Sequence, residues 1–74
     1  LDEAADRFEA ALRINPEAPE PLANLGLIAA QRGQFETAEK YLEGALKANP
    51  SFESAKQNLA RVRADLERSR KSSR

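Results

Sequence analysis

Acidic side chains are among the most numerous groups in this sequence that could carry out chemistry, and their spacing does not favour catalysis. The 74 residues include 12 Asp and Glu. Acid–base catalysis by a pair of carboxylates needs both in one apolar pocket, where their pKa values are driven apart. Instead, we expect these carboxylates on polar helix faces, with Glu43 and Lys47 spaced as a surface ion pair. The residues concerned are Asp2, Glu3, Asp6, Glu9, Glu36, Glu39 and Glu43.

Other catalytic and metal-binding chemistry has little support. The sequence contains no histidine and no cysteine. It therefore lacks the commonest general base and metal ligand, and it has no thiolate or disulfide. Phosphate-binding loops, zinc spacings, nucleophile elbows and calcium loops are also absent. We expect no enzyme activity, no cofactor and no metal.

Charge is divided unevenly along the chain. Residues 1–55 carry ten acids and five bases, whereas residues 56–74 carry two acids and seven bases. No aromatic residue lies among these bases, so stacking on nucleic-acid bases is not provided and nucleic acid is disfavoured as a partner. No apolar run approaches the roughly 18 residues of a membrane span. Nothing assigns a compartment, and cytoplasmic is the default.

An internal repeat organises the sequence. The recurring pairs are Ala4/Ala38, Ala11/Ala45, Leu12/Leu46, Asn15/Asn49, Pro16/Pro50, Asn24/Asn58 and Leu25/Leu59. The two members of every pair are 34 residues apart. A fixed period of this size indicates one supersecondary unit that buries its apolar face only by stacking on a neighbour. The pattern therefore predicts a stacked helical surface rather than an enclosed pocket.

Four helices account for the apolar periodicity. Asn-Pro ends the first and the third, and Gly33 ends the second with a left-handed residue. Ser51 is expected to cap the fourth. The predicted helices are residues 1–13, 21–32, 35–48 and about 51–67, followed by a disordered basic tail at 68–74.

Residues 19–52 resemble one tetratricopeptide repeat, whose pattern is W-x2-L-G-x2-Y…A-x3-F…P. The matching residues are Leu25, Gly26, Gly33, Phe35, Ala38, Leu42, Ala45 and Pro50. Leu22 replaces the usual Trp and Ala29 the usual Tyr, which implies a looser core. Residues 1–18 resemble the second half of a preceding repeat, and 53–67 a closing, capping helix. The resemblance implies an all-α fold, an α–α superhelix that forms a right-handed solenoid over residues 1–67.

The resemblance also implies where a partner binds. In this family the first helices of successive repeats line the concave face. Asn24 and Asn58 occupy equivalent places there, and in some members such asparagines hydrogen-bond the backbone of an extended peptide, because an amide both donates and accepts. Leu27, one turn from Asn24, is suited to anchor an apolar side chain. The implied peptide-binding residues are Glu20, Asn24, Leu27, Gln31, Gln57, Asn58 and Arg61.

The primary hypothesis is a scaffold that binds a peptide or partner protein on this face. One alternative is a homodimer formed through the first helix, because no preceding helix covers Leu1, Ala5 or Phe8. The other alternative is weak binding of RNA or an anionic surface through the basic C-terminal residues.

Overall fold

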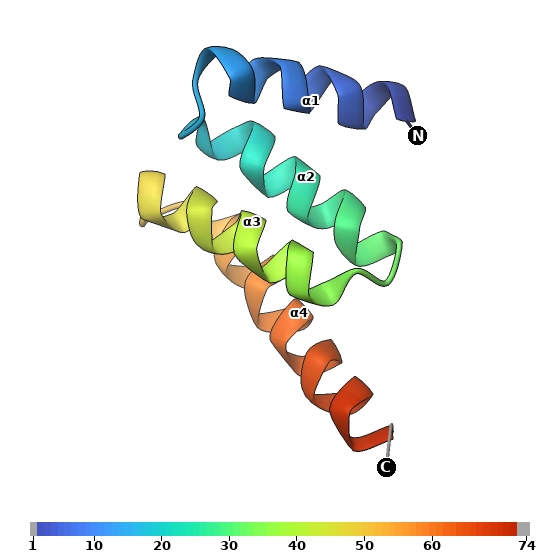
Figure 1. Ribbon diagram of the computed structural model, residues 1–74. Helices are drawn as coiled ribbons and strands as arrows, with labels where there is room; N and C mark the ends of the chain where they lie inside the picture. Colours follow the sequence, from blue (N-terminus) through green and yellow to red (C-terminus); the bar gives the residue numbers. More distant parts are fainter. Residues whose placement is uncertain (1, 73–74) are drawn as a thin grey trace.

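The chain forms an antiparallel stack of helices, as the computed structural model, which describes residues 2–72, shows (Figure 1). The helices are α1 (Asp2–Ile14), α2 (Pro19–Gln31), α3 (Phe35–Ala48) and α4 (Glu53–Ser72). Helices α1, α2 and α3 lie side by side, and α4 packs mainly on α3 (Figure 1). Within residues 2–72 no strand is present. The predicted all-α repeat fold is therefore confirmed, and Leu1 lies outside the described residues.

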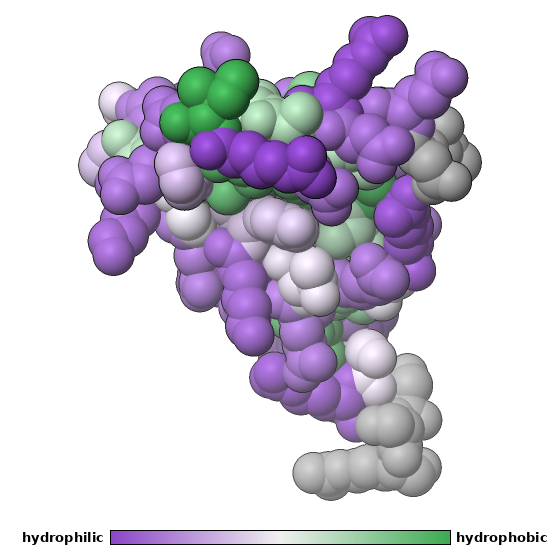
Figure 2. Space-filling view, turned by 45° about the horizontal axis from the view of Figure 1, so that its top comes forward, coloured by the Kyte–Doolittle hydropathy of each residue, from purple (hydrophilic) through white to green (hydrophobic). Residues whose placement is uncertain are grey.

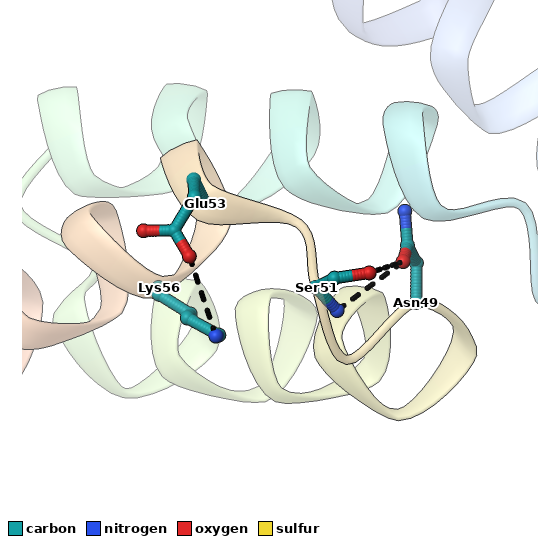
Figure 3. Close-up of polar contacts among 4 residues, drawn as sticks. All are labelled: Asn49, Ser51, Glu53 and Lys56. Atoms are coloured by element: carbon teal, nitrogen blue, oxygen red, sulfur yellow. Dashed lines mark hydrogen bonds and ion pairs between the residues drawn. The ribbon is translucent and has the colours of Figure 1, made fainter.

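The turns that follow α1 and α3 show the repeat in their hydrogen bonds. The Asn15 Oδ1 accepts the Glu17 N–H at 3.2 Å, and one repeat later the Asn49 Oδ1 accepts the Ser51 N–H at 3.3 Å. The Ser51 hydroxyl also donates to the Asn49 Oδ1, at 3.1 Å (Figure 3). An asparagine side chain that accepts from the N–H two residues on fixes a tight turn. Both turns therefore return the chain antiparallel to the helix that it has left.

The turn between α2 and α3 depends on Gly33, as predicted. Its φ is 78°, a conformation that glycine adopts without a Cβ penalty. The Gly33 N–H donates to the Ala30 carbonyl at 3.0 Å, and the Gln34 N–H donates to the Ala29 carbonyl at 2.9 Å. This pattern is a Schellman motif, which satisfies the last carbonyls of α2. At its other end, α2 begins two residues earlier than expected because Pro19 occupies its first position, where a missing N–H costs nothing.

The core lies where α2 and α4 meet the two sides of α3. Leu42 is fully buried at its centre. A Cβ on Gly26 would lie 2.8 Å from the Leu42 Cγ, so glycine allows α2 and α3 to approach closely. The cluster around it contains the buried residues Ala23, Ala29, Ala38, Ala45, Ala55, Leu59, Val62 and Leu66. Leu22 is only half-buried at the edge of this core.

The start of α4 differs from the expectation. The helix begins at Glu53, not after a Ser51 cap. A helix that begins at Glu53 has residue 52 at its N-cap position, so Ser51 lies one residue too early to cap it, and its hydroxyl donates to the Asn49 Oδ1 in the preceding turn. Glu53 instead forms an ion pair with Lys56, at 3.3 Å, in the first turn (Figure 3).

The end of α4 also differs. The expected stop at residue 67 is wrong, because the helix continues to Ser72, and residues 73–74 lie outside the described part of the chain. Two intrahelical ion pairs accompany the added turns: Arg68–Asp65 at 2.8 Å and Lys71–Glu67 at 3.8 Å. Basic side chains in a last turn also complement the helix dipole. Much of the segment expected to be disordered is therefore helical.

Candidate functional site

The predicted residues of α2 form one continuous strip, which we call the α2 face: Glu20, Asn24, Leu27 and Gln31. Their spacing of four, three and four residues places them on the same side of the helix. All four side chains are exposed, including Leu27, at 38%. An exposed leucine flanked by amides offers a partner both apolar area and hydrogen-bonding groups.

Two asparagines lie at equivalent positions of successive helices. Asn24 is exposed on α2, and Asn58, its counterpart one repeat later, is half-buried on α4. Within residues 2–72, neither side-chain amide forms a hydrogen bond with another protein group. Each amide therefore keeps one acceptor and two donor hydrogens available for a ligand backbone.

The predicted residues of α4 are spaced so that they share one side of that helix. Arg61 is the counterpart of Leu27 in the next repeat, so the two lie on corresponding sides of their helices. Gln57 is the counterpart of Ala23, which is buried. Gln57 itself is exposed. Gln57 lies four residues before Arg61, so the two share one side of α4.

Arg63 fixes the position of α4 relative to α3. Its Nε donates to the Glu39 Oε2 at 3.2 Å, and its Nη2 donates to the Glu43 Oε2 at 3.0 Å. These hydrogen bonds, first with Glu39 and then with Glu43, raise the pKa of Arg63 above its ordinary value. The spacing of Glu43 and Lys47 had indicated a different ion pair within α3. Arg63 thereby holds the helix that carries Asn58 and Arg61.

A hollow of about 430 Å³ lies away from the α2 face. The α2–α3 turn and the start of α3 form one wall, and the end of α4 forms the other. Its lining residues are Gly33, Gln34, Phe35, Glu36, Thr37, Leu66, Ser69 and Arg70. The hollow forms because α2 ends before Gly33, whereas α4 continues past the equivalent position. That position in the next repeat is Glu67, which lies within the helix. The replacement of a turn glycine by Glu67 is the feature of the sequence that could have predicted this hollow.

The described residues contain no cluster of three or more acidic side chains able to hold a metal ion. Among helices α1–α4, none is both long and apolar enough to cross a bilayer. The basic residues near the end of α4 are partly neutralised within the helix, since Arg68 pairs with Asp65 and Lys71 with Glu67.

Comparisons with known proteins agree with the repeat. Residues 1–62 match the tetratricopeptide repeat family. The chain is 36% identical over 62 residues to the protein O-mannosyl-transferase TMTC1 of Mus musculus. These aligned residues make up 84% of this chain and 7% of that protein. It is 40% identical over 50 residues to the cellulose synthase operon protein C of Komagataeibacter xylinus. Here the aligned residues make up 68% of this chain and 4% of that protein.

The chain therefore spans less than a tenth of the length of these relatives. No solved structure matches it significantly. The family match covers most of the chain and coincides with the helices and with the repeated hydrogen bonds of the turns. The chain belongs to the tetratricopeptide repeat family.

Proposed function

We propose that this chain is a non-catalytic module that binds an extended polypeptide segment along the α2 face and the neighbouring side of α4. Repeats of this family generally mediate protein interactions. The observation that carries the proposal is the exposure of Leu27 between Asn24 and Gln31 on one side of α2. Burial of Leu27 would supply apolar free energy, and the amides would satisfy backbone groups of the ligand.

The α4 residues give this surface its second edge. Asn58 repeats the amide of Asn24, and Arg61 stands where α2 has Leu27. A peptide that crosses from α2 to α4 would therefore meet an apolar position and then a cationic one. We infer a ligand with an apolar side chain followed by an acidic one. With two such helices, we expect affinity on the order of micromolar.

Selection from a random-peptide display library, followed by ¹⁵N–¹H chemical-shift mapping, tests this proposal. We expect the selected peptides to carry an apolar residue and to shift amide signals of α2 and the first half of α4. Shifts confined to α1 and α3, or a library that yields no binding peptide, would contradict it.

A further inference from the structure

The most exposed large hydrophobic side chain of the described residues is not on the α2 face. It is Ile14, the last residue of α1, at 89% exposure. The space-filling view shows a strongly hydrophobic area toward the end of the molecule where α1 leads into α2 (Figure 2). Nothing in the proposed function uses this side chain.

An apolar hollow of about 200 Å³ lies beside the turn that follows Ile14. Pro16 and Glu17, two and three residues further along the chain, line one side of it. The other lining residues are Leu22, Gly44, Lys47 and Ala48. A projecting side chain and a hollow therefore lie close together on one end of the stack.

The repeat explains why the hollow is there. Gly44 is the counterpart of Ala10 in the next repeat, and Ala48 is the counterpart of Ile14. The second repeat thus has smaller residues at both positions. A Cβ on Gly44 would lie 3.5 Å from the Leu22 Cδ1, so the missing methyl group leaves accessible space above Leu22. The hollow is lined by Ala48, at the position where the first repeat has Ile14.

The rim of the hollow carries one charge of each sign. Glu17 and Lys47 are both exposed, and neither forms an ion pair with another residue of the described chain. A two-fold contact between two copies places the same patch against itself. Glu17 of each copy would then face Lys47 of the other, so both charges would gain a partner.

We propose that this end of the molecule is a self-association surface, at which Ile14 of each copy fills the hollow of a second copy of the chain. The size is suitable, because a cavity of about 150 Å³ is enough to hold benzene, which is similar in volume to an isoleucine side chain. The contact closes on itself, which gives a dimer rather than a filament. The surface is small, so the dimer dissociates on dilution. This contact differs from the dimer predicted from the sequence, which used the outer side of the first helix.

Sedimentation velocity of the 74-residue chain between about 10 μM and about 1 mM tests the proposal. We expect a reversible monomer–dimer equilibrium whose dissociation constant rises at least about tenfold in Ile14→Asp. Because Ile14 is almost fully exposed, this variant should keep its helical circular dichroism. Leu27→Asp is the matched control and should dimerise like the original chain. A monomer at all concentrations, or an unchanged constant in Ile14→Asp, would overturn the proposal.

A charge exchange tests whether a second copy is the occupant. Glu17→Lys and Lys47→Glu should each weaken the dimer several-fold, because like charges then face each other. The double variant restores the opposite charges and should return the dissociation constant to within about twofold of the original. If the double variant stays as weak as the single ones, the two-fold arrangement is wrong.

Discussion

Gly26 of α2 lies directly against Leu42 of α3: a Cβ added to Gly26 would lie 2.8 Å from the Leu42 Cγ and 3.3 Å from the Ala38 carbonyl oxygen. Leu42 is fully buried. The contact sets the spacing of the two central helices, and through them the position of the α2 face.

The first prediction follows from this contact. Gly26→Ala should destabilise the chain by about 1–2 kcal/mol, because overpacking exceeds the gain in helix propensity. Gly44→Ala is the matched control, since its Cβ would lie 3.5 Å from the Leu22 Cδ1, an ordinary contact. The control should gain up to about 1 kcal/mol. Urea unfolding followed by circular dichroism measures both, and equal stabilities of the two variants would refute the packing argument.

The second prediction concerns the core. Leu42→Ala should cost about 2–5 kcal/mol, since it removes a fully buried side chain and leaves a cavity. A domain of this size has little stability to lose, so the variant is expected to be largely unfolded at 37 °C. Leu27→Ala removes the same atoms from an exposed position and should change stability by less than about 0.5 kcal/mol. Thermal melts of the two variants provide the comparison.

The third prediction concerns the turns. Asn49→Ala should destabilise the chain more than Asn15→Ala, because the Asn49 Oδ1 accepts two hydrogen bonds and the Asn15 Oδ1 accepts one. Each lost bond is worth about 0.5–1.5 kcal/mol. Ser51→Ala removes only the hydroxyl donor and should reduce the difference between the two turns. The opposite order in chemical denaturation would show that these turns do not depend on the asparagine side chains.

The fourth prediction concerns Arg63. Arg63→Gln should lower the melting temperature by removing both ion pairs between α4 and α3. Hydrogen bonds raise the pKa of Arg63, so its contribution is fully present below the ordinary pKa of arginine and is lost only above it. Changes of pH near neutrality should therefore not affect the contribution of Arg63. Added salt should reduce the difference in melting temperature between the variant and the original chain.

The matched control for this prediction is Arg68→Gln. Arg68 pairs with Asp65 inside α4, so its removal leaves the α3–α4 contact in place. It should lower the melting temperature less than Arg63→Gln does. Equal effects of the two substitutions would mean that the interhelical ion pairs contribute nothing specific.

Sequence reasoning was most successful where the period and the turn residues agreed. The bounds of α3, 35–48, match the prediction because Gly33 and Asn49-Pro50 determine its ends locally. The end of α4 was missed because the apolar stripe stops at Leu66, while ion pairs and the absence of a turn residue extend the helix.

Tertiary features were harder to predict from the sequence. Ile14 follows Ala11 by three residues and fits the buried periodicity, yet the chain turns directly after it and leaves it exposed. Glu43 has a lysine at the favoured helical spacing but pairs with Arg63 from another helix.

The most direct test of the account is the affinity of one library-selected peptide for the original chain and for Leu27→Asp, measured by fluorescence anisotropy. We predict that Leu27→Asp weakens binding at least about tenfold, because a charge replaces the apolar anchor. Ile14→Asp, at the other exposed hydrophobic position, should bind the peptide as the original chain does. Unchanged affinity in Leu27→Asp, or a loss in Ile14→Asp alone, would contradict the proposal that the α2 face is the binding surface.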